Sequence, residues 1–145
     1  MKRKLFKFFY LLLGAMVLLS CKDEMAATIT EEPLKDIAGT WRIVTLTRNG
    51  EDLSQRIDLS KFKILFDANG NYTMQDKMAF VVSEPGSYKL NDPQYPSGLI
   101  LSPQGKTAQS IKLQFPVIEG KRQLSLTLSP GCAGNTYQYN FVREN

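Results

Sequence analysis

The sequence contains no histidine and only two cysteines, Cys21 and Cys132. Without histidine, the Ser-His and Cys-His pairs of common nucleophilic enzymes are excluded, and imidazole is unavailable as a general base or metal ligand. Two cysteines are too few for a disulfide framework or a four-cysteine zinc site. Cys132 lies in a Pro-Gly-Cys-Ala-Gly loop with no histidine to activate it. We interpret it as an inert thiol, with an intermolecular disulfide as the alternative.

An excess of positive charge is confined to the N-terminus. The net charge of +4 equals the contribution of Lys2, Arg3, Lys4 and Lys7, and the remaining 14 of the 18 basic residues balance the 14 acidic ones. Proteins that track phosphates need clustered lysine and arginine. After the leader, basic residues are scattered singly except for Lys121-Arg122, which we place in a turn. Nucleic acid is therefore excluded as an expected partner.

The first twenty residues have the pattern of a secretory signal peptide. A basic start is followed by twelve uncharged, mostly apolar residues from Phe8 to Leu19. A membrane-spanning helix needs about 20 such residues, so this run is too short to cross a bilayer comfortably. It ends in Leu18-Leu19-Ser20-Cys21, which resembles a bacterial lipobox. That resemblance implies lipidation of Cys21 and attachment to the membrane through an N-terminal lipid. The alternative is a general secretory signal with a coincidental cysteine.

Residues 21–36 are predicted to be a lipidated cysteine and a flexible tether. Residues 22–36 are rich in acidic side chains, contain one proline and lack an apolar period, and a chain of this length reaches about 20 Å. Lys22-Asp23-Glu24 resembles the surface-export signal of Bacteroidetes lipoproteins, which implies an outer-membrane location with exposure at the cell surface. The alternative for these three residues is a solvated start to the tether.

Residues 37–145 read as one all-β domain. Short alternating runs separated by turn residues predict eight or nine strands of an antiparallel up-and-down barrel. The predicted strands are 39–47, 61–67, 71–76, 79–83, 87–91, 99–102, 109–115, 123–128 and 136–143. We expect at most one short helical segment, of one or two turns, which would lie between Leu53 and Leu59 and could cap one end of the barrel.

Several motifs in this domain resemble those of a known group of proteins. Gly39-Thr40-Trp41 matches the Gly-x-Trp signature of the first lipocalin strand. It is followed in order by Asn49-Gly50, by Phe66 to Tyr72, and by Phe80-Val-Val-Ser-Glu-Pro-Gly86 and Asp92-Pro-Gln-Tyr-Pro96. Over residues 37–145 the chain is similar to the lipocalin-like lipoproteins of unknown function found in Bacteroidetes. The resemblance implies a barrel fold, with Trp41 packed across its closed end, and implies no settled activity.

Bulky side chains are predicted to fill the barrel interior, leaving at most a shallow pocket at one end. The predicted inward set is Trp41, Ile43, Phe62, Ile64, Phe66, Phe80, Leu113, Phe115, Leu124, Leu126, Tyr139 and Phe141. A filled interior favours ligand binding at the rim.

Tyrosines are the candidate binding residues, because the ring offers a flat apolar face and a polar tip. Tyr95, between two prolines of a long loop, is the best candidate for an exposed contact, and Tyr88, Tyr137 and Tyr139 join it. Tyr137 and Tyr139 are either lumen lining or core. Simple packing is the alternative for all four.

Two other clusters fit catalysis or metal binding poorly. Asp76, Glu84 and Asp92 lie near strand ends, and a hydrolase would need two of them to face each other. Asp67 to Asn71 superficially resembles a calcium loop, but its glycine comes too early and Met78 stands where the terminal glutamate is required. We expect a plain hairpin turn there, no metal site and no cofactor.

These patterns predict a non-enzymatic, lipid-anchored outer-membrane protein with a binding or interaction role. A glycan or a surface protein is the expected partner at the rim. The first alternative is a carrier that holds a small hydrophobic ligand in the barrel cup. The second is a hydrolase that uses carboxylates.

Overall fold

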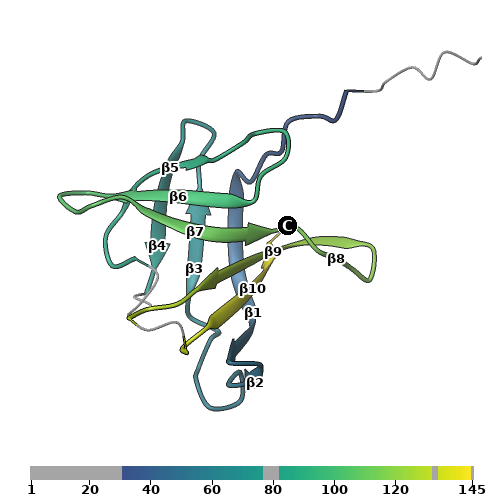
Figure 1. Ribbon diagram of the computed structural model, residues 1–145, viewed down its shortest axis with the longest axis vertical. Coiled ribbons are helices and arrows are strands. Elements are labelled where there is room, and N and C mark those ends of the chain that lie inside the picture. Colours follow the sequence, from purple (N-terminus) through teal and green to yellow (C-terminus); the bar gives the residue numbers. More distant parts are fainter. Residues whose placement is uncertain (1–30, 77–81, 132–133, 145) are drawn as a thin grey trace, which may run out of the picture. The chain divides into compact units, whose positions relative to one another are not determined.

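The computed structural model describes residues 31–76, 82–131 and 134–144 (Figure 1). Backbone contacts divide the chain into Met1–Glu32 and Pro33–Asn145, and the second unit contains every strand discussed below. Cys21, Phe80 and Cys132 lie outside the described residues, as do residues 79–81 of one predicted strand. Across the described part of the chain, no helix is long and apolar enough to cross a membrane.

Ten strands make up the described secondary structure. They are β1 Gly39–Arg48, β2 Glu51–Asp52, β3 Lys63–Phe66, β4 Asn71–Gln75, β5 Gly86–Leu90, β6 Gly98–Pro103, β7 Gln109–Gln114, β8 Val117–Ile118, β9 Lys121–Leu128 and β10 Tyr137–Arg143. Eight of these match the predicted strands to within about two residues. The remaining two, β2 and β8, have two residues each and are too short to show a period in the sequence.

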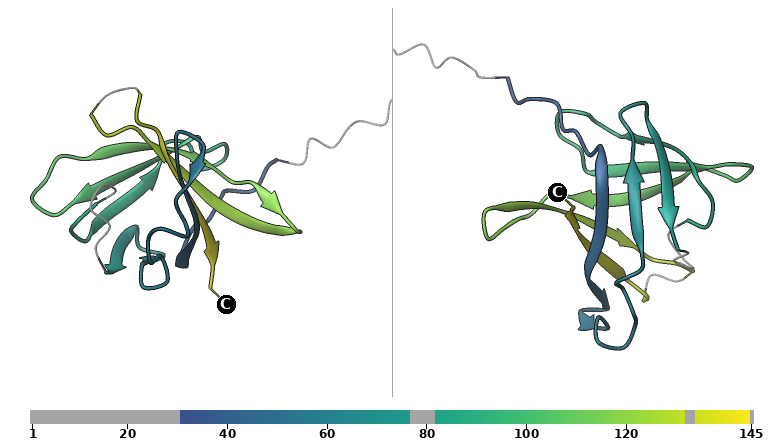
Figure 2. Two further views of the ribbon diagram at one scale, coloured as in Figure 1. Left: turned by 90° about the horizontal axis from the view of Figure 1, so that it is seen from below. Right: turned by 180° about the vertical axis from the view of Figure 1, so that it is seen from behind.

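The eight longer strands close into an antiparallel barrel. Their order is β10-β1-β3-β4-β5-β6-β7-β9, and β9 pairs in turn with β10 (Figure 2). The strand β2 adds only to β1, and β8 adds only to β9. Closure leaves few unpaired edges to aggregate. The predicted all-β, lipocalin-like barrel is confirmed.

The barrel interior is filled by the predicted residues and by others. Ten of the predicted set are buried, Phe115 is half-buried against them, and Phe80 is not described. Sequence reasoning missed a further set of buried side chains: Ile37, Leu46, Leu59, Tyr72, Val82, Leu99, Leu101 and Ile111. Five of these eight lie in strands, Leu46 in β1, Tyr72 in β4, Leu99 and Leu101 in β6 and Ile111 in β7, and the other three lie outside the strands.

The barrel end where β1 begins is closed by Trp41. Its ring is buried, and its Nε1–H donates to the Ile37 carbonyl oxygen at 2.8 Å. The Arg143 guanidinium covers the ring at 5.7 Å from the centroid. Gly39 has φ +135°, and a Cβ there would meet Arg143 Nε at 2.6 Å. Both residues of the Gly-x-Trp signature are therefore packing residues of this end.

The segment from Leu53 to Leu59, where the sequence allows at most a short helix, forms no helix, because side chains hold it in turns. Asp52 Oδ1 accepts from the Ser54 amide at 2.7 Å, and Ser54 Oγ accepts from the Leu46 amide at 2.9 Å. Aspartate and serine side chains of this kind compete with helical hydrogen bonding. Leu59 still reaches the core. The prediction that Lys121-Arg122 lies in a turn is also wrong. These two residues begin β9, and the turn is formed by Glu119 and Gly120.

Candidate functional site

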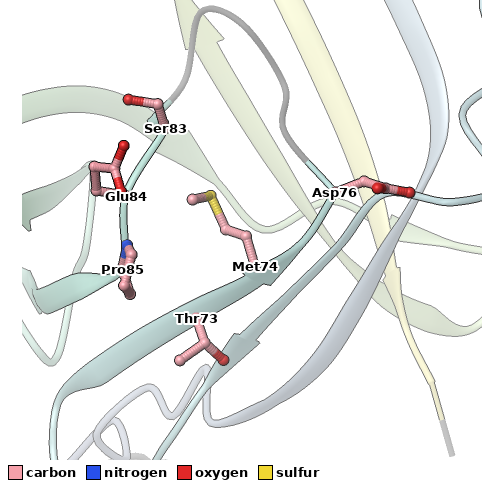
Figure 3. A pocket seen from close by; sticks show the side chains of 6 residues that line it. All are labelled: Thr73, Met74, Asp76, Ser83, Glu84 and Pro85. Atoms are coloured by element: carbon pink, nitrogen blue, oxygen red, sulfur yellow. The ribbon is translucent and has the colours of Figure 1, made fainter.

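The barrel wall separates between β4 and β5. Only Asn71 and Tyr72 of β4 pair with β5, opposite Ser87 and Gly86. Beyond that point, the rest of β4 and the segment 82–85 line a groove of about 610 Å³. Figure 3 shows the groove between these two walls. This groove lies in the barrel wall, whereas the sequence predicts at most a shallow pocket at one end of the barrel.

Side chains of both walls meet in this groove, which we call the β4 groove: Thr73, Met74, Asp76, Ser83, Glu84 and Pro85. Tyr72 and Met74 lie on the same, inward face of β4. Met74 packs against the core, and its side chain extends toward Ser83 and Glu84 (Figure 3). Ser83 Oγ accepts from Lys106 Nζ at 2.6 Å, so the β6–β7 loop holds the far wall. The groove thus has an apolar floor and polar sides.

Gly86 sets the place where the two walls begin to part. It pairs with Tyr72 on one side and with Pro103 on the other. A Cβ at this position would collide with the Ser102 carbonyl oxygen and lie 2.8 Å from Pro103 Cα. Only glycine permits this close approach of β5 to β6.

The three candidate carboxylates do not converge as one site. Asp76 and Glu84 lie on opposite walls of the β4 groove, and Asp76 points away from Glu84 (Figure 3). Asp92 lies in the loop between β5 and β6, at the opposite end of β5 from the groove. There its Oδ1 accepts from the Tyr95 and Gln94 amides, at 3.0 and 2.8 Å. These bonds lower the pKa of the Asp92 carboxyl.

The four candidate tyrosines are also dispersed, and Tyr139 belongs to the core. It is fully buried and stacked on Phe141 at 6.4 Å, and burial raises the pKa of its phenol. Tyr88 is half-buried, packs edge-on to Phe66 at 4.7 Å, and donates its hydroxyl to the Asp67 carbonyl oxygen at 2.8 Å. These contacts are structural.

Tyr137 and Tyr95 have different surroundings. Tyr137 is half-buried under the Arg48 guanidinium, which lies 5.7 Å from its ring centroid. Tyr95 is exposed, as predicted for its loop. Among the four, only Tyr95 presents most of its ring to solvent.

The Asp67 to Asn71 segment is a hairpin turn between β3 and β4. Asp67 Oδ1 accepts from the Asn71 and Asn69 amides at 2.7 and 2.9 Å, and Asp67 Oδ2 accepts from Asn71 Nδ2 at 3.0 Å. Gly70 has φ +82°. Both carboxylate oxygens are thus engaged by the turn itself. Within the described ranges, no three acidic or cysteine residues are placed to hold a metal ion.

Most residues of the β4 groove carry no signal in the sequence. Thr73, Met74 and Ser83 read as ordinary members of alternating strands. Their role depends on where pairing between β4 and β5 stops, and local sequence does not encode the length of a pairing. Only Asp76 and Glu84 were identified beforehand, because carboxylates at strand ends are candidates in any chain.

The whole-chain comparisons agree with a domain that has no assigned activity. No curated protein and no solved structure matches the chain. A family model described as "Domain of unknown function (DUF5004)" matches residues 18–142, which include the whole barrel except the end of β10. The chain therefore belongs to this DUF5004 family of unknown function.

Proposed function

We propose that this chain is an outer-membrane lipoprotein, anchored through a lipid on Cys21, whose barrel binds an extended segment of a partner protein without catalysis. The proposed anchor is supported by the basic start, the short apolar run and the Leu18-Leu19-Ser20-Cys21 pattern. Lys22-Asp23-Glu24 supports exposure at the cell surface.

The observation that carries the binding role is the early end of pairing between β4 and β5. After Tyr72, the edge of β4 facing the groove is not paired with any described strand. An extended peptide can add to such an edge through main-chain hydrogen bonds, while pockets beside it select side chains. The β4 groove supplies such a pocket over Met74.

The lining of the β4 groove favours a peptide over the other expected ligands. Its described lining combines hydroxyl and carboxylate groups with the Met74 thioether, a combination that suits the main chain and side chains of a peptide. An open groove flanked by Asp76 and Glu84 suits a purely hydrophobic ligand poorly. Two carboxylates favour a segment that carries basic side chains.

A non-catalytic role is supported by the disposition of those carboxylates. Acid–base hydrolysis needs two carboxyl groups directed at one bond. Asp76 instead points away from Glu84 (Figure 3). A carrier for a small hydrophobic ligand remains the second candidate, since the volume of about 610 Å³ would hold one.

Native purification from membranes followed by mass spectrometry tests both parts of the proposal. We expect acyl mass on Cys21 and a co-purifying protein. The paired change Asp76→Asn and Glu84→Gln should release that protein, whereas the matched control Glu119→Gln should retain it. Asparagine tolerates the positive φ of Asp76, so the strand end is preserved.

Three outcomes would contradict the proposal. Unacylated Cys21, with unchanged membrane fractionation of Cys21→Ser, would refute the anchor. Equal retention of the partner by the groove variant and the control would refute the site. A stoichiometric small molecule in place of a protein would favour the carrier.

A further inference from the structure

The most exposed large apolar side chains of the described residues gather at one end of the barrel. Leu34, Tyr95, Val117 and Ile118 are 72%, 65%, 62% and 45% exposed. They lie in the segment that leads into β1, in the β5–β6 loop and in β8. Because neighbouring strands are antiparallel, all three segments adjoin the strand ends on the side where β1 begins. We call this the entry end.

Tyr95 is held outward by an ordered loop. Asp92 Oδ1 accepts the Gln94 and Tyr95 amides, and the Lys35 amide donates to the Pro93 carbonyl oxygen at 2.7 Å. The last bond ties this loop to the segment that leads into β1. A side chain fixed in this way loses little conformational entropy when it binds. Tyrosine is also a residue that concentrates at membrane–water interfaces.

Val117 and Ile118 are carried on a hairpin that projects from the barrel (Figure 2). Its turn residues Glu119 and Gly120 both have positive φ, 52° and 73°, as in a tight two-residue hairpin turn. The strand β8 pairs only with the start of β9, through Lys121 and Arg122. The hairpin therefore presents two aliphatic side chains beside two basic ones.

Basic side chains dominate the groove beside this hairpin. Its volume is about 780 Å³, and its basic residues are Arg42, Lys121, Arg122 and Arg143. Two carboxylates also line it, Glu119 and Glu144, and Glu144 is bonded to Lys63 Nζ at 2.9 Å. The other acidic groups of this end are Asp36, Asp67 and Asp92, whose carboxylates accept backbone amides of their own segments, and Glu31 and Glu32 precede Leu34 along the chain. The groove therefore has a local excess of positive charge.

We propose that the entry end rests on the lipid surface, with Leu34, Tyr95, Val117 and Ile118 in the interface and Lys121 and Arg122 against anionic headgroups. This proposal rests on the lipid anchor proposed above. Only twelve residues, 22–33, separate Cys21 from Leu34 in the sequence, so a lipid on Cys21 would limit how far the entry end can lie from the bilayer. Apolar side chains flanked by basic ones are typical of surfaces that lie in a membrane interface.

Quenching of tryptophan fluorescence by brominated lipids tests this docking. The full lipidated protein is reconstituted in phosphatidylcholine vesicles with brominated acyl chains, with and without phosphatidylglycerol. Ile118→Trp is compared with Ile57→Trp, whose parent side chains are equally exposed at 45% and 44%, and Ile57 lies between β2 and β3 at the opposite end of β1 from the entry end. Trp41 is buried in both variants, and its emission is subtracted using the parent protein.

We expect brominated lipid to remove about half of the added emission of Ile118→Trp and little of that of Ile57→Trp, since only the first would lie in the interface. Quenching should be stronger with phosphatidylglycerol, and Lys121→Glu with Arg122→Glu should abolish that difference. Equal quenching of the two tryptophan variants would overturn the docking while leaving the anchor intact. Absence of acyl mass on Cys21 would overturn both. Protection of Ile118 in cells without quenching in pure lipid would favour a protein partner and overturn the proposal.

Discussion

Arg143, at the end of the last strand, covers the ring of Trp41 near the start of the first, with its guanidinium carbon 5.7 Å from the ring centroid. The two residues are also paired in register between β1 and β10. Gly39 leaves the space that the arginine side chain occupies. A short motif in the first strand thus fixes the contact that closes this end of the barrel.

Substitutions in this cluster should separate packing from the cation–π contact. Trp41→Ala removes a large buried side chain and should lower the free energy of unfolding by about 3–5 kcal/mol. Arg143→Ala removes only the exposed guanidinium that covers the Trp41 ring, and it should lower the free energy of unfolding by about 0.5–1 kcal/mol. Urea denaturation followed by circular dichroism measures both. Equal losses would show that the arginine contributes more than a cation–π contact.

Gly86→Ala should destabilise the barrel far more than Gly134→Ala. The added methyl group at Gly86 would collide with the backbone of Ser102 and Pro103. A methyl group added at Gly134 would meet no atom within 4 Å. Overpacking of this kind costs about 1–3 kcal/mol. Urea denaturation of both variants provides the comparison. Similar stabilities would mean that β5 moves away from β6 without difficulty.

Stability should fall as the pH rises above 10, because three tyrosines resist ionisation in the folded protein. Burial raises the pKa of the phenols of Tyr72, Tyr88 and Tyr139 above the ordinary value of 10.0. In the unfolded chain these groups lose their protons first, so alkali favours unfolding. Each group reduces the free energy of unfolding by about 1.4 kcal/mol per pH unit between its two pKa values.

Urea denaturation at several alkaline pH values measures this slope. Tyr139→Phe should give a shallower slope than the parent protein, because one titrating group has been removed. An unchanged slope in Tyr139→Phe would contradict the assignment of that phenol to the core.

Lowering the pH should weaken the β3–β4 turn, because protonation of Asp67 removes the charge that its hydrogen bonds stabilise. Hydrogen bonds from the amide and side chain of Asn71 hold the pKa of the Asp67 carboxyl below its ordinary value. The stabilisation is fully present at pH values above the pKa that Asp67 has in the unfolded chain. It is lost as the pH falls through the lower pKa that Asp67 has in the folded protein. Asp67→Asn should therefore make stability less sensitive to pH below about 4, compared with the control Glu119→Gln. Carboxyl chemical shifts in a pH titration provide the direct measurement.

The sequence predicts the strands of this barrel well because alternation has a period of two and needs no tertiary information. Ile64 and Phe66, or Leu124 and Leu126, identify an inward face from their spacing alone. Tyr139 was correctly placed on the face of Phe141, but the period could not distinguish a core residue from one lining an open cup. Only the depth of the surrounding packing decides between them.

The two surfaces proposed to bind partners are less predictable because they arise from contacts between distant segments. The β4 groove exists because pairing stops after Tyr72, and the entry end combines Leu34, Tyr95 and Val117 from three separate loops and strands. No local pattern marks either one. Tyr95 is the exception, since a tyrosine between two prolines cannot join a ladder and is left at the surface.

Closure of the barrel by β10 has a consequence for the order in which the protein folds. The strand β10 joins β1 to β9, so both of those strands keep an unpaired edge until β10 is in place. The barrel therefore cannot close before β10 has been synthesised and has paired with both neighbours. A chain truncated before Tyr137 would leave one edge of β1 and one edge of β9 unpaired. We expect such a chain to aggregate and to be degraded rapidly.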